Sequence, residues 1–479
     1  MRIMTRRSFT ASGALAGILT GGPPALARQA SASSGLPSDG DVRKMLADRL
    51  EALSAGQDGI GAVAGLIGPE GRRIVAAGRR DVGDTRPLTG DTVFELGSVG
   101  KAFTALLLSD MVLRHEVSLA DPAAKYLPRA ALPERGGRRI SLLDLATHTS
   151  GLPFMPDLPP ASGPAAYGAA DLYRFLAGYR LPRDIGGGWD YSNLGYWLLG
   201  EALAARAGRE FRALVRDRVL APLGMARTGY ALSPAMRSDL AVGHDSALRP
   251  AVWGTAIPVY DLMPAAGMGL CSSAGDVLKL ASAALGYRPS PLAAAIALTV
   301  HTHRAIPGSH NAQALGWTLL GEGRDQLVFR DGGTFGFASC LVWDRARRVG
   351  AVILVNCVAD VGDIGRHILR PDFPLATPSR SRRTEIAVEA AVLARHAGRY
   401  RDDDGDLFTI ALEGSFLTFE APADWGLPKL RIRPESRNDF FAAELPLRVT
   451  FEVGADGATT GMTLFPPRGG KGVPARKVG

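Results

Sequence analysis

The sequence predicts an α/β (α+β) domain followed by a small all-β domain that is barrel-like. Short strand-like stretches at 59–80 and 314–356 bracket a central region with helical periodicity. A segment at 371–385, rich in Pro, Ser and Arg, has almost no periodicity and is typical of a linker. Short strands then alternate with Gly and Asp turns. We therefore expect one domain over 41–370 and a second over 386–479.

The expected elements of the first domain follow from hydrophobic periodicity. Residues 59–80 mix small and apolar side chains and predict a hairpin with its turn at Pro69–Gly71. Residues 98–115 predict a helix that is buried on most sides, because few of its positions are polar. Further helices are expected at 196–207, before Gly208, and near 274–284. After residue 313 the pattern changes, and strands are expected at 314–320, 326–333, 337–344 and 349–356.

Composition excludes several classes of function. The 479 residues are 46% hydrophobic and 21% charged, which is enough for a large buried core. No apolar run reaches about 18 residues, so we expect no transmembrane segment in the mature chain. The net charge is +8, but no run of five or six basic residues occurs, so nucleic acid is not an expected partner. The oligomeric state is left open.

Three cysteines, Cys271, Cys340 and Cys357, are expected to be buried free thiols. The last two lie in neighbouring strand-like stretches, and a bridge between them is an alternative that spacing cannot decide. No spacing of Cys and His indicates a metal site.

The first 27 residues are expected to be an export signal. Arg6 and Arg7 precede a weakly apolar stretch, and Ala25-Leu26-Ala27 fits a cleavage site. The paired arginines are similar to a twin-arginine signal, and an ordinary signal or a lipid anchor is the alternative. Cleavage would remove three Arg and no acidic residue, which lowers the net charge from +8 to +5. The mature protein is expected to be periplasmic or secreted.

Ser98 and Lys101 stand three residues apart at the start of the expected apolar helix. Positions i and i+3 share a helix face, so the amine can reach the hydroxyl. Burial and the positive end of the helix both favour the neutral amine, which a base requires. The chain has only seven Lys against 48 Arg, and Arg cannot give up its proton. We therefore interpret Ser98 as a nucleophile activated by Lys101; a capping Ser beside a solvent-facing Lys is the alternative.

Two further stretches supply chemistry of the same kind. Tyr191 and Asn193 lie just ahead of the helix at 196–207; a phenol can carry a second proton, and an amide can hold a substrate carbonyl. Gly332 and Gly333 end a strand, where backbone N–H groups can approach a ligand and form an oxyanion hole. Each stretch alone is equally consistent with an ordinary turn.

Five stretches, taken together, resemble penicillin-recognising serine hydrolases in order and spacing. They are FELGSVGKAFTALLLSDMV, LLDLATHTSGLP, WDYSNLGYWLLGEALAARAG, LAPLGM and DGGTFGF. The resemblance spans roughly 45–360 and is strongest to class C β-lactamases, D-alanyl-D-alanine carboxypeptidases, D-aminopeptidases and carboxylesterases. It implies an antiparallel sheet flanked by helices, a helical subdomain and no cofactor. The C-terminal part is similar to the small barrel that some members carry.

The resemblance also implies roles for particular residues. Ser98 would be acylated, Lys101 would activate it, Tyr191 would shuttle protons, and Asn193 would contact the substrate amide. The third motif of the family is Lys-Thr-Gly or His-x-Gly, and here it reads Arg330-Asp331-Gly332. The Arg330 cation could anchor a substrate carboxylate. Because it cannot exchange protons as a His can, it weakens the case for efficient β-lactam hydrolysis.

His148, in LATHTSGLP, is expected to hold a loop rather than to catalyse. The predicted activity is acyl transfer on D-amino-acid peptides or β-lactams. A carboxylesterase with the same catalytic residues is one alternative. A non-catalytic penicillin- or peptidoglycan-binding protein is the other.

Overall fold

The computed structural model describes residues 35–54, 58–128, 130–156, 168–251, 263–376, 385–422, 429–442, 447–465 and 472–478. The expected export signal at 1–27 and most of the expected linker at 371–385 lie outside these residues. The hydrolase-like part and the C-terminal barrel are described separately below.

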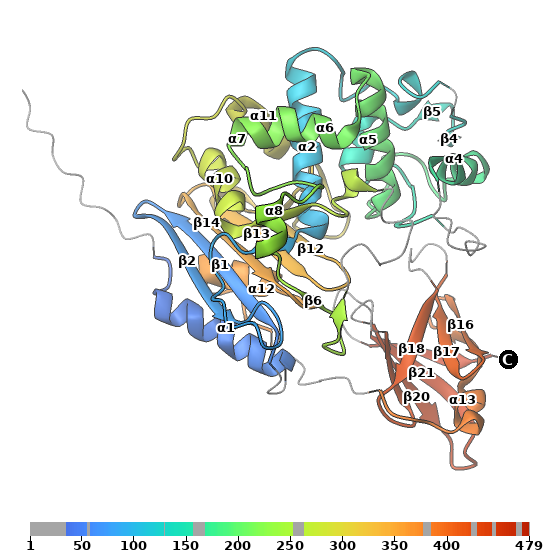
Figure 1. Cartoon of the computed structure of the whole chain (residues 1–479). Coiled ribbons are helices and arrows are strands. Elements are labelled where there is room, and N and C mark those ends of the chain that lie inside the picture. Colours follow the sequence, from blue (N-terminus) through green and yellow to red (C-terminus); the bar gives the residue numbers. More distant parts are fainter. Residues whose placement is uncertain are drawn as a thin grey trace, which may run out of the picture. The chain divides into compact units, whose positions relative to one another are not determined.

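An eight-stranded antiparallel sheet forms the centre of the first part (Figure 1). Its strands, in spatial order, are β2 (Gly71–Gly78), β1 (Gly61–Gly68), β14 (Val349–Val355), β13 (Ala338–Asp344), β12 (Leu327–Gly333), β11 (Thr318–Leu320), β10 (Ala312–Ala314) and β9 (His303–Ala305). The register pairs Ala62 of β1 with Val355 of β14. The predicted hairpin at 59–80 and the antiparallel sheet are both confirmed.

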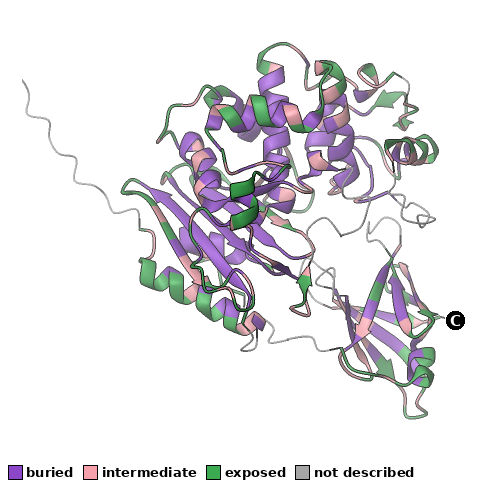
Figure 2. Ribbon diagram, in the orientation of Figure 1, coloured by how far each residue is buried: buried purple, intermediate pink, exposed green. Residues whose placement is uncertain are grey.

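Both faces of this sheet are covered, which explains why its central strands are almost wholly apolar. Along β13, Cys340 and Val342 belong to one core cluster and Leu341 and Trp343 to another, as side-chain alternation requires. Helices α1 (Asp39–Ser54) and α12 (Gly362–Leu369) pack on the first face, and α10 (Ala274–Ala284) on the second. Figure 2 shows buried residues throughout the central strands and exposed ones along the outer side of α1.

The helical region surrounds α2 (Gly100–Leu113), in which residues 100–111 are all buried. Other elements of this region are α3 (Leu142–Ala146), α4 (Ala169–Gly178), α5 (Asn193–Ala207), α6 (Phe211–Val215), a π-helical turn (Arg216–Leu220), α7 (Ala221–Leu223), α8 (Pro234–Asp239) and α11 (Ala293–His301). Short ladders join β3 (Val93–Glu95) to β8 (Cys271–Ser273), β4 (Glu134–Arg135) to β5 (Arg138–Arg139), and β6 (Gly243–His244) to β7 (Pro250–Ala251). The helix predicted near 274–284 is confirmed as α10.

Three predicted boundaries are wrong, each for a local reason. The helix predicted from residue 98 starts as a 3₁₀ turn, η1 (Gly97–Val99), before α2. The helix predicted at 196–207 starts at Asn193, because the Ser192 hydroxyl accepts from the Gly195 amide at 2.8 Å and caps it. The single strand predicted at 314–320 is a hairpin, β10 and β11, turning at Gly316 with φ +79°.

A buried ion pair joins α1, at the start of this part of the chain, to α12, near its end. Arg49 binds Asp363 through two contacts of 2.5 and 3.1 Å, and the side chains are 8% and 5% exposed. Burial alone would raise the pKa of the Asp363 carboxyl, but the hydrogen bond and charge of Arg49 outweigh it and hold that pKa below its usual value.

Asp363→Ala is therefore expected to lower the free energy of unfolding by about 3–5 kcal/mol, because it leaves a buried guanidinium without its counter-charge. Urea denaturation followed by tryptophan fluorescence measures the loss. The matched control is Asp48→Ala, which removes the exposed Lys44–Asp48 pair and should leave the transition unchanged. Equal effects of the two substitutions would contradict the prediction.

The C-terminal part is a closed antiparallel barrel, as predicted. Its strands are β15 (Gly398–Asp402), β16 (Leu407–Glu413), β17 (Phe416–Glu420), β18 (Leu430–Pro434), β19 (Asp439–Ala442), β20 (Arg448–Val453), β21 (Thr459–Phe465) and β22 (Val473–Lys477), preceded by α13 (Ala390–His396). Closure through β15 and β22 leaves no unpaired sheet edge. Large buried side chains such as Tyr400, Phe408 and Phe440 fill the interior.

His396 is buried in the barrel part. Its Nε2 lies 2.8 Å from the Arg437 carbonyl oxygen, which can only accept, and its Nδ1 lies 2.9 Å from the Thr459 hydroxyl. The ring stacks on Phe451 at 4.2 Å. Burial lowers the pKa of His396 below its ordinary value of 6.5.

The barrel is therefore expected to lose stability as the pH falls below about 6.5, because the unfolded chain takes up a proton that the folded ring refuses. Hydrogen exchange of peptides from β20 and β21, corrected for intrinsic rates, should show less protection at pH 5.5 than at pH 7.5. In His396→Gln the difference should shrink. An equal difference in both proteins would contradict the prediction.

All three cysteines are buried, and neither Cys340 nor Cys357 forms a disulfide, so the alternative of a bridge between these two does not hold. Burial raises the pKa of the Cys357 thiol to about 12, which keeps it protonated and unreactive. None of the helices in the described part of the chain combines the length and apolar character needed to cross a membrane.

Candidate active site

The candidate nucleophile lies where η1 meets α2, on a backbone packed unusually closely against its neighbours. Ser98 is in η1 and is partly buried. Gly97 has φ +50°, and a Cβ there would lie 2.6 Å from the Gly333 carbonyl oxygen. A Cβ on Gly100 would lie 2.4 Å from the Gly267 Cα. Glycines on both sides of Ser98 thus let the turn approach β12 and η4 (Pro264–Ala266).

Lys101 is fully buried, and its amine lies close to oxygens of Ser98, Asn193 and Ala266. Nζ lies 3.1 Å from Ser98 Oγ, 2.6 Å from Asn193 Oδ1 and 2.9 Å from the Ala266 carbonyl oxygen. The last two oxygens only accept hydrogen bonds, so a neutral amine that donates to both turns its lone pair toward Ser98. This is the geometry that a base for the Ser98 hydroxyl requires.

Tyr191 contacts the same hydroxyl. Its OH lies 2.7 Å from Ser98 Oγ. Lys101 Nζ lies 4.9 Å from the centre of its ring, and the Arg330 guanidinium carbon lies at the same distance. The charged Arg330 guanidinium at this range is attracted to the aromatic ring and restricts its position.

His148 holds the loop that carries Tyr191. Its Nδ1 accepts from the Ser192 amide at 3.1 Å, and its carbonyl oxygen accepts from the Asp190 amide at 2.9 Å. The imidazole ring lies 4.5 Å from the Tyr191 ring. His148 itself has φ +57°, an uncommon backbone conformation for a residue other than Gly. These contacts agree with the expected loop-holding role.

Arg330, on β12, is 3% exposed and faces the catalytic groups. Its Nε donates to the Ser98 carbonyl oxygen at 3.1 Å, and a terminal nitrogen donates to the Tyr191 hydroxyl. A guanidinium in this position can stabilise negative charge on the Tyr191 oxygen. These contacts engage two of the three guanidinium nitrogens. They therefore compete with the predicted use of Arg330 as an anchor for a substrate carboxylate.

Gly332 and Gly333 bring the end of β12 against the nucleophile. A Cβ on Gly332 would lie 2.2 Å from the Leu96 carbonyl oxygen and 2.8 Å from the Ser98 amide nitrogen. No side chain fits there, so the strand and η1 are in direct backbone contact. All seven residues predicted from the sequence are brought together here. Two further groups were not predicted from the sequence: the Ala266 carbonyl oxygen, which contacts Lys101, and the Met155 sulfur, which contacts Asn193.

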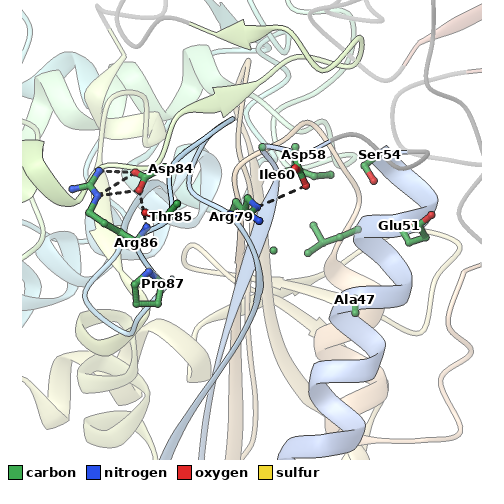
Figure 3. Close-up of a pocket in the computed structure, with 13 residues that line it drawn as sticks. Ala47, Glu51, Ser54, Asp58, Ile60, Arg79, Asp84, Thr85, Arg86 and Pro87 are labelled. Carbon is green, nitrogen blue, oxygen red and sulfur yellow. Dashed lines mark hydrogen bonds and ion pairs between the residues drawn. The ribbon is translucent and has the colours of Figure 1, made fainter.

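A separate pocket of about 430 Å³ lies away from this site (Figure 3). It is lined by the end of α1 and by residues 58–60, 78–79 and 84–87. Its arginines are paired, Arg86 with Asp84 at 2.6 Å and Arg79 with Asp58 at 3.7 Å. None of the predicted site residues lines it, so it gives no reason to place the chemistry elsewhere.

A serine hydroxyl within hydrogen-bonding distance of a buried amine and of a phenol is the arrangement that a serine hydrolase requires. The chain belongs to the beta-lactamase family, whose sequence model matches residues 45–370. The resemblance found in the sequence is therefore confirmed.

Individual relatives agree with this assignment. The D-alanyl-D-alanine-carboxypeptidase/endopeptidase AmpH of Escherichia coli K12 is 28% identical over 299 residues, covering 58% of this chain and 75% of its own. A beta-lactamase of Pseudomonas fluorescens is 26% identical over 353 residues, covering 66% and 94%. A class C beta-lactamase of known structure shares the fold with a TM-score of 0.60 at 20% identity, covering 71% of this chain and 98% of its own.

Proposed function

We propose that this chain is an exported serine hydrolase that forms an acyl-enzyme on Ser98 and acts on D-amino-acid peptides or β-lactams. The single observation that carries the proposal is the position of Ser98 Oγ, within hydrogen-bonding distance of both Lys101 Nζ and the Tyr191 hydroxyl. The likeness to a D-alanyl-D-alanine carboxypeptidase and to a beta-lactamase supports the substrate class. Residues 1–27 support export.

In the first half of the proposed reaction, Ser98 Oγ attacks the substrate carbonyl carbon while its proton passes to Lys101 Nζ. The oxyanion is stabilised by backbone N–H groups of Ser98 and of β12 near Gly333. When the C–N bond breaks, Tyr191 gives its proton to the leaving nitrogen and is reprotonated from Lys101. In the second half, water attacks the ester carbonyl carbon and gives one proton to Lys101 by way of Tyr191. That proton then passes to Ser98 Oγ as the bond between the acyl carbon and Oγ breaks, which releases the acid product and restores Ser98.

A carboxylesterase is the second candidate, and the contacts of Arg330 favour it. The guanidinium binds Ser98 and Tyr191 instead of pointing away from them. Esters without a carboxylate do not need a cation to anchor them. An Arg330 that is engaged with Ser98 and Tyr191 therefore suits such esters at least as well as it suits D-amino-acid peptides, which carry a carboxylate.

The test combines adduct formation with a substrate panel. The mature protein is incubated with a penicillin, its intact mass is measured, and any adduct is mapped. A persistent adduct on Ser98 supports a slowly deacylating peptidase, and loss of penicillin without an adduct supports a beta-lactamase. With neither, turnover of a p-nitrophenyl ester supports the esterase. If the protein binds penicillin but forms no adduct and turns over no substrate, the proposal is contradicted and a non-catalytic binding protein is favoured.

A further inference from the structure

Both ends of the Asn193 carboxamide are engaged inside the site. Oδ1 accepts from Lys101 Nζ at 2.6 Å, which fixes the orientation of the amide. Nδ2 therefore points the other way, where it lies 3.6 Å from the Met155 sulfur. Asn193 is 2% exposed and Met155 is 7% exposed. A thioether is a weak acceptor, so this donor is held by a partner that a better acceptor can replace.

The backbone around Met155 is hydrogen-bonded to the segment that follows Tyr191. The Phe154 carbonyl oxygen accepts from the Asn193 amide at 2.9 Å, and the Pro153 carbonyl oxygen accepts from the Ser192 hydroxyl at 2.6 Å. The Phe154 ring stacks on Tyr191 at 5.9 Å. The part of Met155 that remains adjustable is its side chain, which has three rotatable bonds and a polarisable sulfur.

We propose that Met155 determines which acyl groups the site prefers, by occupying the hydrogen-bonding position on Asn193 that an acyl-side amide carbonyl of the substrate takes over. The inference rests on the proposed function. A substrate whose acyl group carries an amide carbonyl exchanges a weak N–H···S contact for an N–H···O=C bond. A plain aliphatic acyl group leaves the thioether in place and packs against it.

Met155→Gln tests this directly. Gln has nearly the same length and shape, and its amide oxygen is a strong acceptor that the substrate would have to displace. Because the substrate then has to displace one additional hydrogen bond, we expect KM for an N-acetylated D-alanyl-D-alanine peptide to rise about five- to tenfold, with kcat little changed. This rise corresponds to about 1.0–1.4 kcal/mol, which lies within the range for one net hydrogen bond. The kinetics of p-nitrophenyl butyrate, which lacks the second carbonyl, should stay within about twofold.

Met155→Leu is the matched control, because it keeps the apolar volume and removes the acceptor. It should leave KM for the peptide unchanged or lower it. Thermal unfolding and titration of Ser98 with an acylating probe show that each variant is folded and intact. A parallel change for peptide and ester, or no change for either, would overturn the role of Met155.

A binding measurement separates this inference from the proposed function. The same peptide is titrated into Ser98→Ala protein carrying Met155, Gln or Leu at position 155, so that no turnover is needed. Weaker binding with Gln alone supports the role of Met155 even if the substrate class of the enzyme differs. Equal binding by all three, or no binding by any, contradicts it. Failure of the wild-type protein to form an adduct or to turn over any substrate contradicts only the proposed function.

Discussion

Ser98→Ala is expected to lower kcat/KM for any substrate that the protein hydrolyses by about 10⁴-fold or more. The substitution removes the one oxygen that both Lys101 Nζ and the Tyr191 hydroxyl contact. Without it there is no group to form the acyl bond, and what rate remains comes from binding and from the backbone N–H groups. Initial rates with the ester and the peptide, and the loss of the penicillin adduct by mass, measure the effect.

The fold should survive this change, because Ser98 is held by backbone packing of Gly97 and Gly100. Thermal unfolding of the variant should therefore match that of the wild type. Ser109→Ala, in α2 and away from the site, is the control and should keep its activity. If Ser98→Ala hydrolysed every substrate at the wild-type rate, the catalytic assignment would be wrong.

Lys101→Arg is expected to cost about 10²–10⁴-fold in kcat, the usual range for loss of a general base. Arg keeps a positive charge and can donate to the oxygens of Asn193 and Ala266. It cannot present a lone pair to Ser98, because its guanidinium stays protonated in proteins. Raising the pH to 10 should not restore the rate. Steady-state kinetics between pH 6 and pH 10 test both statements.

Because Lys101 is fully buried, a larger side chain can also disturb packing. Lys101→Met keeps the unbranched chain and removes both charge and base. If the Met variant unfolds at the wild-type temperature and is as slow as the Arg variant, lost proton transfer explains the effect. Activity of Lys101→Arg within tenfold of wild type would exclude Lys101 as the base.

Much of the fold and the site could be predicted because the signals are local. The i, i+3 spacing of Ser98 and Lys101 survives the unexpected 3₁₀ turn, since both helix types bring these positions together. The hairpin of β1 and β2 follows from a short polar turn between apolar runs. By contrast, the hydrogen bond between Arg330 and Tyr191 spans 139 positions and depends on the sheet register. Its existence could not be read from either stretch alone.

Other contributors to the site carry no recognisable sequence signal. Ala266 supplies only its backbone carbonyl oxygen, which any residue possesses. Met155 is a common core residue, and its contact with Asn193 depends on how two loops fold together. The split of 314–320 into two strands follows from Gly316, where a Cβ would lie 2.8 Å from the Lys101 carbonyl oxygen. Such close approaches are properties of the folded chain.

The order of the strands in the sheet also determines when this part of the chain can finish folding during synthesis. Strand β1 leaves the ribosome early, yet its neighbour β14 is among the last elements of this part of the chain to be made. Ser98 and Lys101 likewise emerge long before Arg330 and Gly332. No nascent chain that stops before residue 333 carries the whole set of predicted site residues. Most of the polypeptide therefore has to be synthesised before the site around Ser98 can be complete.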